Sequence, residues 1–355
     1  MQHCLITGGS GFVGIELARQ LVAAGSRVTI YDLHPPAAPD IEAQLTYVQG
    51  DVRDRQKLTD ASAGVEVFFH LAAAVPLTRA GKAFDEINVG GVENAVAACR
   101  AHGVGQLVHL SSSAIYGVPT GCPVREDTPP QPFGLYGPAK LRGERVAIAA
   151  RSPDLAVAVI RPRTVIGPGR LGIFDLLFDW IRKDAPIYLL GACDQPFQLV
   201  SNRDMAAAMA ATAAARASGE YNVGADEYTS LRTDLEALAD SVGSRSRVVG
   251  VPAWLARPTL RALDALRLSP LVDWHYRTID KEFWFDNQRP KAELDWRPQD
   301  SNLTMLRDAY EWHVAHHATL ARSGRSAHRS PLTRGLLGVL SALPIIGRSG
   351  KRRPS

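Results

Sequence analysis

The first 14 residues constrain the fold of this chain more than any other segment. A short apolar run over residues 3–7 leads into a turn in which Gly8, Gly11 and Gly14 recur every third residue, and helical periodicity follows over 12–24. A glycine turn between a strand and a helix lets a phosphate approach the backbone, where the helix N-terminus supplies N–H groups and a positive dipole. Gly8 is expected to form the tight turn, Gly11 to admit a pyrophosphate and Gly14 to let helix and strand pack closely. The segment therefore predicts a dinucleotide-binding βα unit.

The alternation of strand and helix signals continues through the first 165 residues. Apolar strand patterns occupy 27–31, 45–48, 65–70, 106–110 and 155–160, and helical patterns occupy 83–101 and 137–150. Strands separated by helix-length segments form parallel sheets with right-handed crossovers. The predicted fold class is α/β: a doubly wound parallel-sheet Rossmann domain with a smaller mixed C-terminal domain.

The pattern changes after Gly167-Pro168-Gly169. Helices are expected over 173–183, 203–217, 231–242, 252–266 and 305–316, with a short strand at 221–223. We predict that residues 1–166 form the dinucleotide-binding domain and that 196–224 return to it. Residues 167–195 and 225–321 are expected to form the smaller substrate-binding domain, and 322–355 a basic and apolar tail.

Composition argues against several classes of protein. The four cysteines (Cys4, Cys99, Cys122 and Cys193) lie far apart, which argues against a disulfide scaffold or a metal site and predicts a reducing, cytoplasmic location. Of the 40 Lys and Arg residues, eight lie beyond residue 321 with no acid among them, so the preceding body carries 32 basic against 36 acidic side chains. A mildly acidic body predicts no nucleic-acid-binding fold.

Asp32 follows the second expected strand, 18 residues after Gly14. A carboxylate at this place accepts hydrogen bonds from both ribose hydroxyls and repels a 2′-phosphate. The position therefore favours NAD over NADP as the cofactor. The alternative is an acid in a solvated loop.

Tyr136 and Lys140 stand four residues apart at the start of an expected helix, so they share one face. A nearby ammonium and a nicotinamide cation favour a phenolate, which predicts a phenol that exchanges a proton near neutrality. Ser111-Ser112-Ser113 follows the fifth expected strand, at the edge where open α/β sheets bind ligands. A hydroxyl there can hold a substrate oxygen.

These segments together resemble the extended short-chain dehydrogenases/reductases, also called NAD-dependent epimerase/dehydratases. The resemblance covers about residues 3–316. It rests on residues 7–14, Gly50-Asp51-Val52, His70-Leu71-Ala72-Ala73, Asn88-Val89, the serine run with Ile115-Tyr116-Gly117, the Tyr136–Lys140 segment, Arg161-Pro162 and Gly167-Pro168-Gly169.

The resemblance implies a role for each matching residue. Tyr136 would be the acid/base, Lys140 would orient the ribose and tune the phenol, and Ser112, four residues before Tyr116, would be the catalytic hydroxyl, with Ser113 as the fallback. The residues implied in cofactor binding are Gly8, Gly11, Phe12, Val13, Gly14, Asp32, Asp51, Val52, Leu71, Ala72, Ala73, Ser111, Tyr136, Lys140 and Pro162.

Departures from the family pattern bear on the substrate. Sugar-nucleotide 4,6-dehydratases carry Thr-Asp-Glu where this chain has Ser112-Ser113-Ala114, so elimination chemistry is disfavoured. Sugar-nucleotide epimerases place a pyrophosphate-binding Arg in the segment that here reads 195–200 without one. The Arg161-Pro162-Arg163 arrangement instead resembles the 3β-hydroxysteroid-dehydrogenase-like and keto-lipid-reducing branches. Ser113, Arg163 and Gln198 are the candidate substrate contacts, with a structural salt bridge as the alternative for Arg163.

Three functions follow as hypotheses. The first is NAD-dependent hydride transfer at a secondary alcohol or ketone of a hydrophobic, lipid- or steroid-like substrate. The second is an NDP-sugar epimerase with retained NAD. The third, an idle NAD-sensing scaffold, is disfavoured by the intact Ser112, Tyr136 and Lys140 set.

The tail supports the first hypothesis indirectly. Residues 332–346 are apolar and lie between basic flanks, but the segment is too short to span a bilayer. An apolar helix with basic ends is suited to an anionic membrane interface. The alternatives are packing on the body of the chain or on a second copy in a homodimer.

Overall fold

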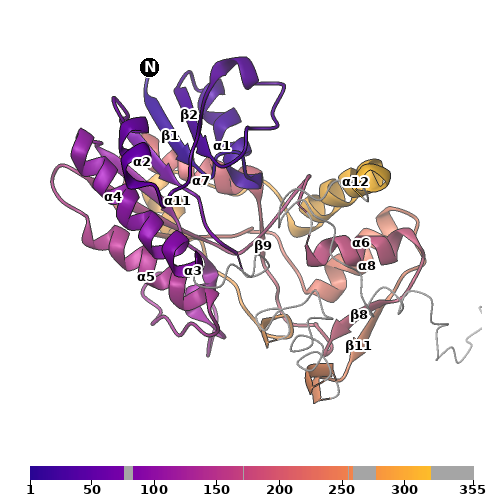
Figure 1. Ribbon diagram of the computed structural model, residues 1–355. Coiled ribbons are helices and arrows are strands. Elements are labelled where there is room, and N and C mark those ends of the chain that lie inside the picture. The colour runs from indigo at the N-terminus through magenta and orange to yellow at the C-terminus, as the bar shows by residue number, and fades with distance from the viewer. Residues whose placement is uncertain (76–82, 171, 255, 259–276, 321–355) are drawn as a thin grey trace, which may run out of the picture.

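The computed structural model (Figure 1) describes residues 1–355 except 76–82, 171, 255, 259–276 and 321–355. A parallel sheet of seven strands, in the order β10-β6-β5-β4-β1-β2-β3, forms its larger part. These strands are β1 (His3–Thr7), β2 (Arg27–Asp32), β3 (Leu45–Gln49), β4 (Val67–His70), β5 (Gln106–Leu110), β6 (Ala156–Pro162) and β10 (Gly219–Val223). The strand order reverses between β1 and β4, where open α/β sheets bind ligands beyond their carboxyl ends. The predicted α/β class and parallel sheet are confirmed.

Helices cover both faces of this sheet. On one face α1 (Phe12–Ala23), α7 (Asn202–Ala214) and α11 (Gln288–Leu294) enclose a core that includes Ile6. On the other, α2 (Arg55–Ala61), α4 (Gly91–His102) and α5 (Tyr136–Ala149) enclose a core that includes Leu5. Successive strand residues point to opposite faces, which is why neighbours in β1 join different cores. We call this part the sheet half.

A second apolar core lies beside the sheet half (Figure 1). Its helices are α6 (Ile173–Arg182), α8 (Leu231–Ser241) and α12 (Asn302–Leu320), and its strands β8 (Ile187–Leu190) and β11 (Val248–Val251) pair in parallel. A further parallel pair, β7 (Thr164–Ile166) with β9 (Leu199–Ser201), lies at the junction of the two parts. We call this part the second half; the residue boundaries given above for two domains remain a prediction.

The structure differs from the expected elements in several places. Helix α2 and strands β7, β8, β9 and β11 are additional, because they are short and the strands pair with partners far away in sequence. The helix expected over 83–101 is interrupted: α3 (Ala83–Asp85) continues as a π-helical turn at Glu86–Gly90 before α4 begins. Within that turn the Asn88 amide donates to the carbonyl oxygens of Phe84 and Ala74, at 2.9 and 3.1 Å. The expected helix over 252–266 lies largely outside the described residues, as does the tail.

Two features are absent from the described part of the chain. No helix there has the length and apolar character needed to cross a membrane. Nor do three or more His, Cys, Asp or Glu side chains gather there in a way that could hold a metal ion.

Candidate active site

The glycine turn lies directly against the loop that follows β4. Gly8 has a left-handed φ of 69°, and a Cβ there would lie 2.8 Å from the backbone nitrogen of Ala72. A Cβ on Gly14 would lie 2.5 Å from the Cα of Gly9. The sequence therefore needs glycine at both places, and the close packing brings Leu71, Ala72 and the turn together as expected.

Asp32 is held beside this turn by two backbone amides. Its Oδ2 accepts from the N–H of Ser10 at 3.1 Å and its Oδ1 from the N–H of His34 at 3.1 Å. A basic candidate for a 2′-phosphate partner, Arg53, binds Asp51 at 2.5 Å and Glu86 at 3.4 Å. The Arg53 hydrogen bonds hold the pKa of Asp51 below its usual range. The carboxylate of Asp32 is thus held in place, and the Arg53 guanidinium is already paired with two other carboxylates.

Tyr136 opens α5 and makes a hydrogen bond with Ser112, which caps the 3₁₀ turn Ser113–Tyr116. Burial raises the pKa of Tyr136, while the Ser112 hydrogen bond and the charge of Arg170 act in the opposite direction. The expected lowering therefore does not occur in the protein alone. It needs the positive charge of the oxidised nicotinamide as well.

Lys140 lies one helical turn further on and is buried. Its Nζ donates to the carbonyl oxygen of Leu110 at 2.6 Å, and burial lowers its pKa to about 8. Beneath it the rings of His70 and His109 stack with centroids 5.6 Å apart. Burial lowers the pKa of His70 to about 3 and that of His109 well below its usual range, and the Lys140 charge adds to both. Both rings are therefore uncharged at neutral pH and add no second positive charge near the Lys140 ammonium.

A buried network lies behind the serine run. Ser111 Oγ donates to Glu144 Oε2 at 2.5 Å, and Arg161 Nη2 pairs with Glu144 Oε1 at 2.7 Å. Arg161 Nη1 also donates to the Tyr116 hydroxyl at 2.7 Å. The Ser111 side chain is therefore occupied within the protein, and its expected contact with the cofactor remains a prediction.

The three candidate substrate residues lie in different environments. Arg163 Nη1 donates to Ser113 Oγ at 3.3 Å, which places both beside Ser112. Gln198 is fully buried, and its amide donates to the carbonyl oxygens of Ala225 and Phe285 and accepts from the N–H of Phe285. The Gln198 amide is thus bonded to backbone groups and is not free to bind a substrate. We therefore keep Ser113 and Arg163 as candidate substrate contacts and remove Gln198.

Arg170 is a site residue that the sequence reasoning missed. Its guanidinium lies 5.7 Å from the centroid of the Phe12 ring, and its charge acts on Tyr136. It thus lies between the glycine turn and the phenol. The signal was its place directly after Gly167-Pro168-Gly169, a loop that follows β7 at the junction of the two parts.

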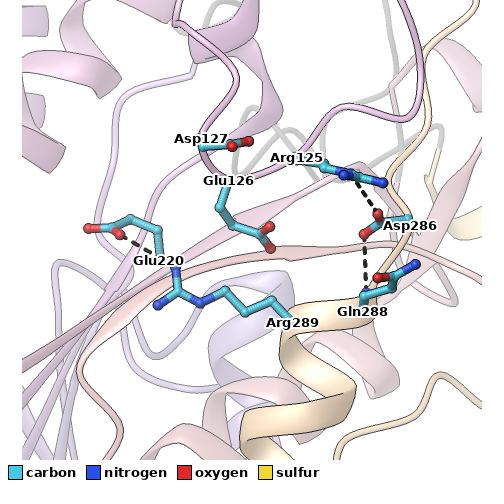
Figure 2. Close-up of a pocket in the computed structure, with 7 residues that line it drawn as sticks. All are labelled: Arg125, Glu126, Asp127, Glu220, Asp286, Gln288 and Arg289. Carbon is cyan, nitrogen blue, oxygen red and sulfur yellow. Dashed lines mark hydrogen bonds and ion pairs between the residues drawn. The ribbon is translucent and has the colours of Figure 1, made fainter.

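A polar hollow in the described part of the chain lies apart from Ser112 and Tyr136. Figure 2 shows seven charged or polar side chains around a space of about 390 Å³: Arg125, Glu126, Asp127, Glu220, Asp286, Gln288 and Arg289. Arg125 pairs with Asp286 at 3.1 Å and Arg289 with Glu220 at 3.9 Å. Its charges are mostly paired with one another, and Ser112 and Tyr136 are not among its lining residues. We therefore do not assign it to the chemistry.

The residues at the β1–β4 edge fit NAD. The turn at Gly8 and Gly14 has no room for side chains, as a pyrophosphate cradle requires, and Asp32 stands at the end of β2 for the ribose. Asp51 and Val52 follow β3, where the adenine would lie. Ser112, Tyr136 and Lys140 come from the loop after β5 and from α5. Their place at the nicotinamide remains a prediction.

Comparisons with known proteins agree with this geometry. Residues 4–224 match the model of the NAD dependent epimerase/dehydratase family. The chain is 35% identical to the uncharacterized protein y4nG of Sinorhizobium fredii, over 96% of this chain and 86% of that one. It is 25% identical to the mouse sterol-4-alpha-carboxylate 3-dehydrogenase, decarboxylating, over 83% and 88% of the two chains. Among solved structures it is similar to DesIV, a dTDP-glucose 4,6-dehydratase of Streptomyces venezuelae with NAD and TYD bound, at 25% identity and a TM-score of 0.73 over 90% and 98% of the chains.

Proposed function

The chain belongs to the NAD dependent epimerase/dehydratase family, and on that premise we propose that it moves hydride between NAD and a secondary alcohol or ketone of a hydrophobic, lipid- or steroid-like substrate. The observation that carries the proposal is the Ser112–Tyr136 hydrogen bond one helical turn from buried Lys140. A small, mostly apolar cavity is lined by Arg163, which contacts Ser113, the chain neighbour of Ser112. NAD is the cofactor and supplies the hydride acceptor or donor.

Each residue of the set has one task. Ser112 donates a hydrogen bond to the substrate oxygen and holds it beside the phenol. Tyr136 takes the hydroxyl proton in oxidation and returns it in reduction. Lys140, with its pKa lowered to about 8 by burial, places a positive charge one turn from the phenol. That charge favours the phenolate, because an opposite charge nearby stabilises the ionised form.

A small cavity that Arg163 lines favours a hydrophobic substrate. It is lined by Arg163 and two threonines together with apolar side chains, namely Ile173, Phe174, Leu177, Phe197, Leu231, Ile279 and Phe283. Apolar walls with few polar groups are typical of sites for lipid-like ligands. The mouse relative is named for a sterol substrate, which supports the same class.

An NDP-sugar epimerase with retained NAD is the second candidate. It is favoured by the likeness to DesIV and by two guanidinium groups near the site, Arg163 and Arg170. Against it stands the apolar lining, since a pyrophosphate needs several charge-assisted partners.

One experiment separates the candidates. NADH formation or consumption is followed with sterols, 3-oxo and 3-hydroxy lipids and UDP-sugars, and the NAD content of the purified protein is measured. The proposal expects turnover of a lipid alcohol or ketone with added NAD. Retained NAD with sugar epimerisation and no net NADH would reject it in favour of the second candidate.

The partner expected for the site is a small molecule. Contact of residues 322–355 with a membrane surface, in a cytoplasmic protein, and a homodimer are proposals that rest on the sequence alone. An interfacial tail would place the active site close to a membrane-dissolved lipid.

A further inference from the structure

A buried guanidinium beside the site has no carboxylate partner in the described residues. Arg163 is 4% exposed, its Nη1 makes a long 3.3 Å hydrogen bond to Ser113 Oγ, and its Nε has no hydrogen-bond partner there. Arg161, two residues earlier, is paired with Glu144 at 2.7 Å. Among the described residues, Arg161 thus forms a salt bridge and Arg163 does not. The alternative role considered for Arg163, a structural salt bridge, therefore does not explain its burial.

Aromatic rings surround this guanidinium. Its Cζ lies 3.9 Å from the centroid of Phe283, 5.7 Å from that of Phe197 and 5.9 Å from that of Phe285. Ring faces stabilise a cation but accept little of the hydrogen bonding of a guanidinium, which has five N–H donors. Burial lowers the pKa of Arg163 to about 9, so the side chain is still charged at neutral pH. A buried charge of this kind is costly unless an anion pairs with it.

The space next to Arg163 has room for a small anionic group. The cavity that Arg163 lines measures about 50 Å³, several times the minimum for one water. Apart from Arg163, Thr164 and Thr278, its walls are apolar. One cation in apolar surroundings suits a single carboxylate on a hydrophobic body, whereas a pyrophosphate would need further charged donors.

We propose that Arg163 binds the carboxylate of the substrate, which is therefore a hydroxy or oxo acid with a hydrophobic body. The inference rests on the proposed function, since it uses Ser112 and Tyr136 as the reacting end. Ser113, which contacts Arg163, is the chain neighbour of Ser112. A carboxylate close to the reacting carbon, as in a 3-hydroxy or 3-oxo acid, suits this order of residues. The mouse relative is named as a 3-dehydrogenase of a sterol 4-carboxylate, which carries its carboxylate in such a position.

A binding measurement tests this inference independently of the reaction. The NAD-saturated full-length protein is titrated with dodecanoate and with dodecanol by calorimetry, for the unchanged protein and for Arg163→Met, Arg163→Lys and Arg125→Met. Dodecanoate should bind more tightly than dodecanol, and Arg163→Met should weaken dodecanoate about 10- to 100-fold, the range for hydrogen bonds to a charged group. Arg163→Lys should lose less, because it keeps the charge without the planar fork. Arg125→Met, at an exposed ion pair, is the matched control and should change neither ligand.

Two outcomes overturn the inference. Equal binding of acid and alcohol, or no binding of either, shows that no carboxylate site exists beside the apolar cavity. UDP-glucose is titrated in the same way, and an Arg163→Met loss confined to UDP-glucose, with dodecanoate unaffected, assigns the guanidinium to a nucleotide phosphate. Thermal unfolding and NAD binding of each variant establish that Arg163→Met is folded. Failure of the proposed function is a different result: acid binding that depends on Arg163, without NADH formation from any 3-hydroxy acid.

Discussion

The sheet half and the second half of this protein use the chain in opposite ways. In the sheet half, β1, β2 and β3 are neighbours in sequence and in space, and the residues that would hold NAD come from the loops directly after them. In the second half, strands pair with distant partners, and one cage around Arg163 takes rings from before β9 and from before α11. The residues proposed to bind the cofactor therefore lie in short local motifs. Those proposed to bind the substrate come together only through long-range packing.

Tyr136 is the proposed acid/base, so its replacement gives the largest expected effect. Tyr136→Phe should fold and bind NAD, and should lose about 10²- to 10⁴-fold in turnover because the proton has no other carrier. The measurement is kcat on the substrate that the NADH survey identifies. Tyr188→Phe, a phenol packed on Trp180 in the second half, is the control and should keep normal kcat. Near-normal turnover of Tyr136→Phe would remove it from the chemistry.

Cofactor choice tests the claim that the sheet half works from local motifs alone. Asp32 is fixed by two amides and cannot move aside, so NADP should bind about 100-fold or more weakly than NAD, the equivalent of about 3 kcal/mol. Asp32→Asn should narrow this ratio, while Asp40→Asn, which removes an exposed partner of Arg19, should not. Titrations followed by intrinsic fluorescence measure both. Equal NADP binding by the unchanged protein would contradict the assignment and direct attention to Arg53 and His34.

The buried pair His70 and His109 in the sheet half predicts how the stability of the protein depends on pH. His313 of the second half lies 2.9 Å from Asp175, whereas both ring nitrogens of His109 lack hydrogen-bond partners in the described residues. Because the pKa of His109 is lowered in the folded state, the unfolded chain binds the extra proton, and stability is lost as pH falls below about 6.5. Each such histidine should cost about 2 kcal/mol between about pH 7.5 and pH 5.

Urea unfolding at both pH values measures this effect. His109→Leu should lose less stability on acidification than the unchanged protein, and His34→Asn, at an exposed position, should match the unchanged protein. An acid sensitivity in His109→Leu as large as that of the unchanged protein would show that this ring is not the source.

The tail should have the smallest effect on catalysis, since all the residues proposed for the chemistry precede it in the sequence. Full-length protein should sediment with phosphatidylserine vesicles at low salt and release as salt rises, because attraction is about 1 kcal/mol per basic residue and is screened. A chain ending at Ser330 should not sediment but should keep turnover of a water-soluble substrate. Loss of folding or of a dimer on truncation would instead make the tail a structural strap.

The same comparison explains which parts of the fold and of the candidate site could be predicted from the sequence. The glycine turn, Asp32 and the Tyr136–Lys140 pair could be found because each lies within one element or one turn. Strands β8 and β11, the aromatic cage and the occupied amide of Gln198 could not, since each depends on partners brought together only by folding. The pKa of Tyr136 is raised in the protein alone because burial outweighs the nearby favourable contacts, and the depth of burial of a side chain depends on the whole fold.

The junction at β7 and β9 has a consequence for exchanging parts between relatives. The chain leaves the sheet half after β6, returns after β9, leaves again after β10 and returns once more to place α11 on the sheet. The second half is therefore a set of insertions rather than a separable module. A chimera that takes its substrate range from a relative must replace several segments at once, since any one of them alone would meet foreign packing partners. New specificities in such an architecture are expected to arise by drift within the insertions rather than by shuffling of whole units.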